Sequence, residues 1–174
     1  MILIHTALLC EAQTFIEHYK LKKTNSNPKI YLNNILIVVI SGVGKENTNN
    51  ALKYIFNNYK ISKAFNIGIA GSSNKNDKIG QLFCTNHKLT DTKHKDLISG
   101  DTVTTIKESE NIKTNCLYDM EGDYFLEYVL NKLSLDNICI FKIVSDYLEN
   151  KILSKDYIKS LISNHKLIIC KYIT

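Results

Sequence analysis

The sequence predicts an α/β fold, a three-layer sandwich in which a mostly parallel central sheet carries helices on both faces. Short apolar runs alternate along the chain with segments whose apolar residues recur every three or four positions, which is the pattern of strands alternating with helices. Runs such as 35–40 and 138–141 are apolar at consecutive positions, as in strands buried on both faces of a parallel sheet. A chain of 174 residues suffices for one core, so we assign residues 1–174 to a single domain.

The N-terminal part is predicted to alternate strands with helices. Apolar positions at helical spacing, such as Phe15 and Ile16, indicate a helix, and Asn33-Asn34 is a hairpin-type turn between two strands. In chain order, the expected elements are a strand at 2–7, a helix at 11–20, strands at 29–31 and 35–40, a helix at 47–58 and a strand at 64–71.

The C-terminal part continues the alternation. Phe125, Val129 and Leu130 define the apolar face of a helix that precedes the most apolar strand of the chain. The expected elements are a strand at 80–85, an irregular polar stretch at 86–96, a strand or loop at 98–103, a helix at 122–132, a strand at 138–144, a helix at 152–162 and a last element of unassigned type at 166–173.

Composition excludes several classes of function. All 22 basic residues are lysines, dispersed along the chain, whereas base recognition in DNA relies on arginine, so we expect no nucleic-acid partner. No apolar run approaches the roughly 20 residues of a membrane span, and the N-terminus lacks a basic signal region, so we expect no membrane association and a cytoplasmic protein. Five cysteines without a CxxC pair indicate free thiols, and we expect neither a metal nor a cofactor.

Acidic residues and glycine turns follow several of the predicted strands. Burying a carboxylate costs several kcal/mol unless it is paired or hydrogen-bonded, so acids at strand ends suggest a ligand site. Ligands of open α/β sheets bind beyond the carboxyl ends of the strands, where we expect these groups to converge. They are Glu11, the loops 42–44 and 68–71, Asp101, Glu121 and Asp146.

Each feature also has an ordinary structural explanation. Glu11 would stabilise the dipole of a helix that begins there, and the glycine loops are compatible with plain strand-to-helix turns. Gly42-Val43-Gly44-Lys45 is not a nucleotide-binding P-loop, because Glu46 follows the lysine where Ser or Thr is required.

Taken together, five blocks in order resemble the nucleoside phosphorylase and nucleosidase family, and most closely its methylthioadenosine/S-adenosylhomocysteine nucleosidase branch. The blocks cover most of residues 1–150. They are Ala7-Leu8-Leu9-Cys10-Glu11, Ser41-Gly42-Val43-Gly44-Lys45-Glu46-Asn47, Asn66-Ile67-Gly68-Ile69-Ala70-Gly71, Ser99-Gly100-Asp101, and the pair Asp119-Met120-Glu121 with Val144-Ser145-Asp146.

The resemblance implies a role for each site residue. Glu11 would orient a water molecule towards C1′ of the sugar, and Asp146 would protonate the leaving base. Met120 and Glu121 would hold the ribose, with Glu121 accepting from its hydroxyls. Further substrate-binding positions would be Gly71, Ser72, Ser145 and Val103.

The expected activity is hydrolysis of the N-glycosidic bond of a purine nucleoside such as methylthioadenosine or S-adenosylhomocysteine, by a protein that resembles homodimeric enzymes. Phosphorylases hold phosphate with arginine, which this chain lacks, although Lys45 could contact phosphate more weakly. A phosphorylase and a nucleoside-binding protein without catalysis stay open as alternatives. The resemblance also locates a difference: Thr102-Val103-Thr104 stands where the family has an aromatic residue that stacks on the base.

Overall fold

The protein folds around one twisted sheet. A computed structural model describes residues 1–100, 113–149 and 151–173. Four parallel strands form its centre, in the order β4 (Leu36–Ile40), β1 (Ile2–Thr6), β5 (Lys63–Ser72) and β10 (Ile138–Asp146). These strands are almost entirely buried, which explains why their sequences are apolar at consecutive positions.

Shorter strands extend the sheet on both sides, and most of them are antiparallel to their central neighbours. The strand β3 (Lys29–Leu32) pairs antiparallel with β4, and β2 (Lys22–Lys23) pairs antiparallel with β3. On the other side, β6 (Leu82–Cys84) is antiparallel to β10 and carries β7 (Lys93–His94).

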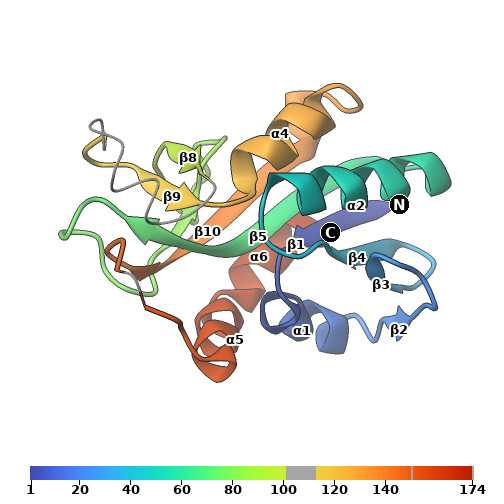
Figure 1. The fold of residues 1–174 in the computed structure, drawn as a ribbon, viewed down its shortest axis with the longest axis horizontal. Helices are drawn as coiled ribbons and strands as arrows, with labels where there is room; N and C mark the ends of the chain where they lie inside the picture. The colour runs from blue at the N-terminus through green and yellow to red at the C-terminus, as the bar shows by residue number, and fades with distance from the viewer. Residues whose placement is uncertain (101–112, 150, 174) are drawn as a thin grey trace.

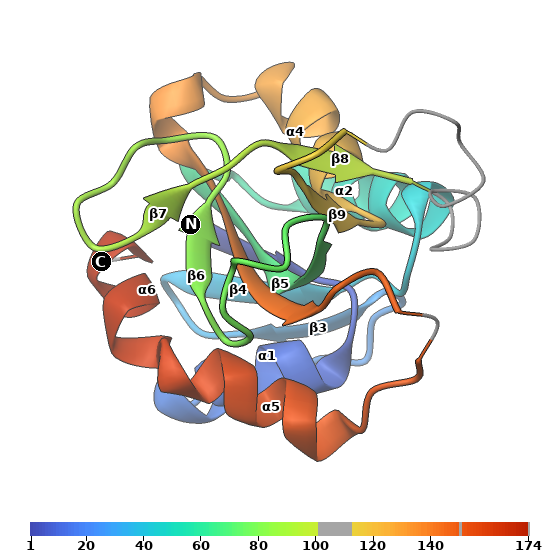
Figure 2. The ribbon, with the colours of Figure 1, turned by 90° about the vertical axis from the view of Figure 1, so that its left-hand side faces the viewer.

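A small additional pair of strands lies over the carboxyl end of β5. The strand β9 (Leu117–Asp119) pairs antiparallel with Gly71 and Ser72, and β8 (Leu97–Ser99) pairs with β9. Figures 1 and 2 show this pair beside the end of the central sheet and next to α4. The last residues of β9 are thereby brought to the edge where the parallel strands end.

Helices cover both faces of the sheet (Figure 1). One layer contains α1 (Leu9–His18), α5 (Lys155–Asn164) and α6 (Lys166–Ile173), and the other contains α2 (Lys45–Asn58) and α4 (Gly122–Leu130). Each layer has its own apolar cluster, because alternate residues of a strand point to opposite faces: Phe65 and Ile67 pack with the first layer and Ala64 with the second. The predicted three-layer α/β sandwich is therefore confirmed.

Some element boundaries differ from the sequence-based expectation. The helix expected at 152–162 begins at Lys155, because the Oγ atom of Ser154 accepts from the backbone N–H of Tyr157 at 3.2 Å and caps it. The helix expected at 11–20 begins two residues earlier, at Leu9, and the unassigned segment 166–173 is helical. A short 3-10 helix, Leu135–Asn137, precedes β10, and no helix in the described ranges is long and apolar enough to cross a membrane.

Candidate functional site

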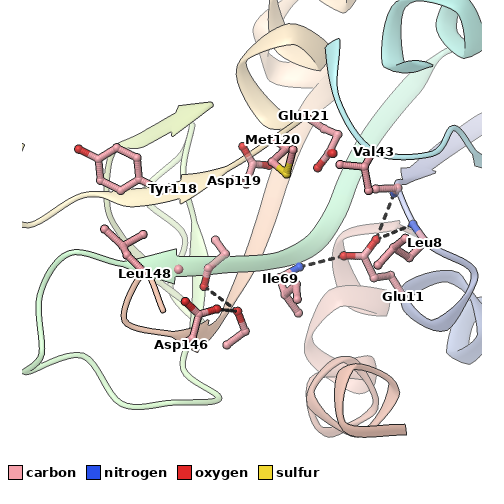
Figure 3. A pocket seen from close by; sticks show the side chains of 14 residues that line it. Leu8, Glu11, Val43, Ile69, Tyr118, Asp119, Met120, Glu121, Asp146 and Leu148 are labelled. Carbon is pink, nitrogen blue, oxygen red and sulfur yellow. Dashed lines mark hydrogen bonds between the residues drawn. The ribbon is translucent and has the colours of Figure 1, made fainter. Parts of the chain in front are cut away.

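A cavity of about 170 Å³ lies where β1, β5 and β10 end and where β9 leads into α4. Figure 3 shows that its walls come from segments far apart in the sequence, with Glu11 on one side and Asp146 and Leu148 on the other. The groups that were expected to converge at the carboxyl ends of the strands thus lie around one cavity, except Asp101, which falls outside the described residues. The predicted residues that line the cavity are Glu11, Gly71, Met120, Glu121, Ser145 and Asp146.

Glu11 is held by backbone donors rather than by another side chain. Its Oε2 atom accepts from the N–H groups of Ala7 at 3.1 Å and Leu8 at 2.9 Å, and Oε1 accepts from Ile69 at 3.1 Å. A carboxylate has about four acceptor positions, so one position on Oε1 stays available for a ligand. Burial raises the pKa of Glu11, although Lys142 and the three N–H groups act in the opposite direction.

Close packing at Gly68 brings Glu11 towards a buried cation. A Cβ atom at this glycine would lie 2.8 Å from Oε1 of Glu11, so only glycine lets this carboxylate approach the strand; the same Cβ would lie 3.4 Å from Nζ of Lys142, an ordinary contact distance. The carboxylate of Glu11, on α1, and the ammonium group of Lys142, on β10, thus approach the same point of β5 beside the cavity.

Lys142 is a buried cation beside the cavity that the sequence analysis does not predict. It lies on β10 between apolar neighbours, is 2% exposed, and its ammonium group pairs with Oδ2 of Asp119 at 2.5 Å. Burial alone would lower the pKa of Lys142, but Asp119, Glu121 and Glu11 together outweigh burial and raise it. A lysine within an otherwise apolar strand was the available signal, because burying an unpaired cation is strongly unfavourable.

Asp119 organises the turn between β9 and α4. Both of its oxygens accept from the N–H of Gly122, at 3.1 and 2.9 Å, and Oδ1 also accepts from the hydroxyl of Ser99 at 2.5 Å. Asp123 accepts from the backbone N–H of Ser99 at 2.8 Å, so two acids fix β8 against the start of α4. This arrangement positions Met120 and Glu121 at the cavity wall.

The surroundings of Glu121 raise the pKa of its carboxyl group well above the usual range. Its Oε1 atom accepts from the backbone N–H of Gly44 at 2.8 Å, which joins the turn before α2 to the start of α4. Burial and the neighbouring Asp119 raise the pKa of Glu121 to about 7, while Lys142 and the Gly44 N–H limit the rise. Near neutral pH this side chain can therefore both accept and donate a hydrogen bond.

A buried histidine lies close to this charged group. The Nδ1 atom of His5 lies 2.8 Å from the amide nitrogen of Asn66, so Nδ1 accepts and Nε2 carries the hydrogen. Burial and the charge of Lys142 lower the pKa of His5 to about 3. His5 is therefore neutral under physiological conditions and adds no second positive charge beside Lys142.

Asp146 and Ser145 end β10 at the opposite side of the cavity from Glu11 (Figure 3). The Oδ2 atom of Asp146 accepts from the hydroxyl of Ser145 at 2.6 Å, and Oδ1 accepts from the N–H of Glu149 at 3.1 Å. These two bonds fix the carboxyl group while leaving further acceptor capacity for a ligand.

One predicted substrate-binding residue, Ser72, does not line the cavity. The hydroxyl of Ser72 donates to Asp77 at 2.5 Å, and Asp77 forms a buried ion pair with Lys95, so Ser72 belongs to a polar cluster beside the cavity. Val103 lies outside the described residues, as does Asp101. Tyr118 and Leu148 line the cavity but were not predicted, because nothing in their local sequence marks them.

The part of the chain that the structure describes holds no cluster of three or more residues suited to bind a metal ion. None of the five cysteines, all of which lie in the described part of the chain, forms a disulfide.

Comparisons by sequence find no relative: no protein-family model matches, and no curated protein matches either. Comparison with solved structures gives strong matches over nearly the whole chain. The 5′-methylthioadenosine/S-adenosylhomocysteine nucleosidase of Campylobacter jejuni has a TM-score of 0.80 at 16% identity, with 98% of this chain and 97% of that chain covered.

Two further structures show the same fold. The corresponding nucleosidase of Neisseria meningitidis, in complex with methylthio-immucillin-A, has a TM-score of 0.80 at 15% identity, with 99% and 97% covered. Futalosine hydrolase of Helicobacter pylori has a TM-score of 0.78 at 14% identity, with 99% and 96% covered. The resemblance seen in the sequence is thereby confirmed at the level of the fold, which is the nucleoside phosphorylase-like α/β fold.

Proposed function

We propose that the protein is a nucleoside N-ribohydrolase, which cleaves the N-glycosidic bond of a purine nucleoside such as methylthioadenosine or S-adenosylhomocysteine with water as the nucleophile. The observation that carries the proposal is that one cavity has Glu11 at one end and Asp146 at the other, with Met120 and Glu121 on the wall between them. This is the arrangement that attack on one side of a sugar and departure of a base on the other side require.

Glu11 is suited to activate water. Its remaining acceptor position on Oε1 can take a hydrogen from a water molecule, and the pKa raised by burial makes it a stronger base than an exposed glutamate. Lys142 lies on the same side, and its positive charge stabilises the ionised form of Glu11. The water oxygen would attack C1′ as the bond from C1′ to the base breaks.

Asp146 is suited to assist the leaving base. The electron pair of the breaking bond moves into the base, and a proton from the carboxyl group of Asp146 neutralises it. The ribose acquires positive charge in the transition state, which the nearby carboxylates of Glu11 and Glu121 stabilise. Glu121 and the backbone around Met120 would also bind the sugar hydroxyls.

Phosphate fits this cavity less well than water. Glu11 and Glu121 would repel a phosphate anion, and Lys142 is already paired with Asp119. Lys45, the other lysine considered as a phosphate contact, has its ammonium group over the ring of Tyr124, 5.1 Å from the ring centroid. Water is therefore the better nucleophile for this set of side chains.

The proposal is tested by following base release from a panel of nucleosides in phosphate-free buffer and in the same buffer with added phosphate. We expect free base and free ribose in both buffers at equal rates. Base release that occurs only with phosphate, with ribose 1-phosphate as the second product, would identify a phosphorylase instead. A nucleoside that binds without any base release would identify a binding protein.

The assembly and the location of the protein stay predictions. We expect a homodimer in the cytoplasm, with a small-molecule nucleoside as its ligand and with no nucleic-acid or membrane partner. Size-exclusion chromatography with light scattering measures the mass of the assembly directly.

A further inference from the structure

A buried ion pair beside the cavity takes no part in the chemistry proposed above. Lys95 is 8% exposed and Asp77 is 9% exposed, and the ammonium group of Lys95 contacts Oδ2 of Asp77. The same carboxylate accepts from the hydroxyl of Ser72, and the ammonium group lies over the ring of Phe83, 5.2 Å from its centroid. Burying two charges is expensive, and two apolar side chains of similar size often stabilise a fold equally well. The ion pair is therefore poorly explained by stability alone.

The ion pair fixes the turn between β5 and β6. The backbone N–H of Asp77 donates to the carbonyl oxygen of Asn74 at 3.1 Å, while its carboxylate holds Ser72 at the end of β5. Lys95 follows β7 and reaches the same carboxylate, so it ties the turn to the outer strands of the sheet. The backbone carbonyl of Asp77 thereby has a fixed position and direction.

This carbonyl group holds the segment that carries Asp146. The hydroxyl of Tyr147, the residue after Asp146, donates to the carbonyl oxygen of Asp77 at 2.8 Å. The carboxyl group of Asp146 is bonded to neighbours in its own segment, Ser145 and Glu149, which orient it within that segment. The hydrogen bond from Tyr147 ties the segment to the turn between β5 and β6.

Packing leaves the segment around Asp146 room to move. Ser145 and Asp146 line the cavity of about 170 Å³, and together with Tyr147 they line a second cavity of about 610 Å³. The register of β10 also shifts here, because Val144 lies opposite Ala70 whereas Asp146 lies opposite the next residue of β5. A bulge of this kind changes the direction of a side chain. The aim of the Asp146 carboxyl group therefore depends on how the segment is held.

We propose that the ion pair of Lys95 and Asp77, acting through Tyr147, orients the carboxyl group of Asp146 for proton transfer to the leaving base. This inference rests on the proposed nucleosidase function. Lys95, Asp77 and Tyr147 are positioning residues, since none of them lines the cavity that joins Glu11 to Asp146. A displacement of order 1 Å lowers catalysis by about 100-fold, so a hydrogen bond outside the cavity can control the rate.

The first test compares two substrates in the wild-type protein and in Tyr147→Phe. Methylthioadenosine needs protonation of its leaving base, whereas 4-nitrophenyl riboside releases a stable phenolate without an acid. Tyr147→Phe removes the hydrogen bond to Asp77 and keeps the ring. It should lower kcat for methylthioadenosine by about fivefold to tenfold, which is the worth of one hydrogen bond. The KM values and kcat for the riboside should stay nearly unchanged.

Tyr172→Phe is the matched control for Tyr147→Phe. It also removes a tyrosine hydroxyl that donates a hydrogen bond, to Asp91 at 3.3 Å, but Tyr172 does not line the cavity. The control should change neither kcat. An unchanged ratio of the two kcat values in Tyr147→Phe would overturn the proposal.

A second variant removes the ion pair itself. Loss of one charge would leave the other buried and unpaired, so Asp77→Asn and Lys95→Met are combined. The combined variant should lose kcat for methylthioadenosine and keep kcat for the riboside, with thermal unfolding as the check of folding. Adding Tyr147→Phe should cause no further loss, because effects that pass through one contact are not additive. If the combined variant does not fold, Ser72→Ala, which loosens Asp77 and keeps both charges, takes its place.

Two results would contradict the role of the ion pair. Losses that add up between the combined variant and Tyr147→Phe would show that the ion pair does not act through Tyr147. An equal loss with both substrates would show that it supports the fold and does not orient Asp146.

A measurement without turnover separates this inference from the proposed function. Carbon-13 NMR of protein labelled at the aspartate carboxyl carbons reads the surroundings of Asp146, whose resonance is identified by its absence in Asp146→Asn. The resonance should move in Tyr147→Phe and in the combined variant, and it should stay in place in Tyr172→Phe. If no nucleoside is cleaved but the resonance moves in this way, the hydrolase function is wrong and the positioning of Asp146 stands. If the resonance does not move, the positioning is wrong.

Discussion

The ammonium group of Lys142 lies 2.5 Å from Oδ2 of Asp119, and both side chains are only 2% exposed. The pair joins β10 to β9, so it links the strand that carries Asp146 to the turn that carries Glu121. The negative charges of Glu11 and Glu121 also raise the pKa of Lys142, so one ammonium group interacts electrostatically with three carboxyl groups beside the cavity. This charged cluster is the structural basis of the site.

Removing this cation should destabilise the fold. Lys142→Met leaves Asp119 buried without its partner, and breaking a buried ion pair in this way costs about 3–5 kcal/mol of the free energy of unfolding. Urea unfolding measures the change. As the control, Lys159→Met removes the exposed ion pair with Glu17, at 3.0 Å, and should change stability little. Equal effects of the two substitutions would contradict the role assigned to Lys142.

The stability of the protein should depend on the protonation of Glu121. The pKa of Glu121 is about 7 in the folded protein, compared with 4.5 for an unperturbed glutamate, as in the unfolded chain. Between these two pH values the folded state keeps a proton that the unfolded state loses. The free energy of unfolding should therefore fall as the pH rises from about 4.5 to about 7, by on the order of 3 kcal/mol. Glu11 and Asp123, whose pKa values are also raised, add to the same trend.

Comparison with a variant isolates this contribution. His5 acts in the opposite direction, because its folded pKa of about 3 means that acid protonates only the unfolded state and lowers stability below about pH 6.5. Glu121→Gln should flatten the fall between pH 4.5 and 7 and leave the effect of His5 intact. Glu127→Gln, an exposed position on the same helix, is the control and should keep the wild-type profile. A Glu121→Gln profile identical to wild type would show that this carboxyl group does not titrate as described.

Most of the fold could be predicted because its central strands are marked by sequence. Apart from Lys142, the run from Ile138 to Val144 is apolar on both faces, and so is most of β5, as strands buried between two layers of helices require. The short strands β2 and β7 could not be predicted, since two exposed residues each carry no periodic pattern. Their positions depend on the neighbouring strand rather than on their own residues.

The candidate site was predicted in part, for a similar reason. Glu11 and Asp146 are visible in the sequence because acids directly after buried strands are unusual. The pairing of Lys142 with Asp119 depends on the register of β10 and the path of β9, which no local pattern encodes. The left-handed backbone of Leu148 is likewise set by tertiary packing.

Substitution of Gly68 should impair catalysis by displacing Glu11. In Gly68→Ala the new Cβ atom would lie 2.8 Å from Oε1 of Glu11, so the carboxylate has to move away from the N–H of Ile69. A displacement of this kind, of order 1 Å, lowers catalysis by about 100-fold. The rate of base release under saturating nucleoside measures the effect, which should appear in kcat rather than in KM.

Gly80→Ala separates this effect from a general loss of stability. Gly80 has a φ angle of 81°, so alanine is strained there, but its Cβ would have Cδ2 of Leu161, at 3.7 Å, as its nearest neighbour. This variant should lose thermal stability and keep its kcat at temperatures where it is folded. Full activity in Gly68→Ala would show that the position of Glu11 is not critical.

Replacement of Asp146 should abolish the departure of an ordinary base while leaving the fold intact. In Asp146→Asn the side chain can still accept from the N–H of Glu149, and the hydroxyl of Ser145 can accept from the new amide instead of donating. Loss of the proton donor should lower kcat for purine nucleosides by about 10²- to 10⁴-fold. Asp136→Asn, at an exposed position before β10, should have no effect.

A substrate whose leaving group needs no proton makes this test specific. Release of 4-nitrophenolate from 4-nitrophenyl riboside requires no general acid, because the phenolate is a stable anion. The Asp146→Asn variant should therefore hydrolyse this riboside at nearly the wild-type rate, whereas a Glu11→Gln variant, which lacks the base that activates water, should be slow with both substrates. If Asp146→Asn lost the two activities equally, Asp146 would act in binding or folding and not as the acid for the leaving base.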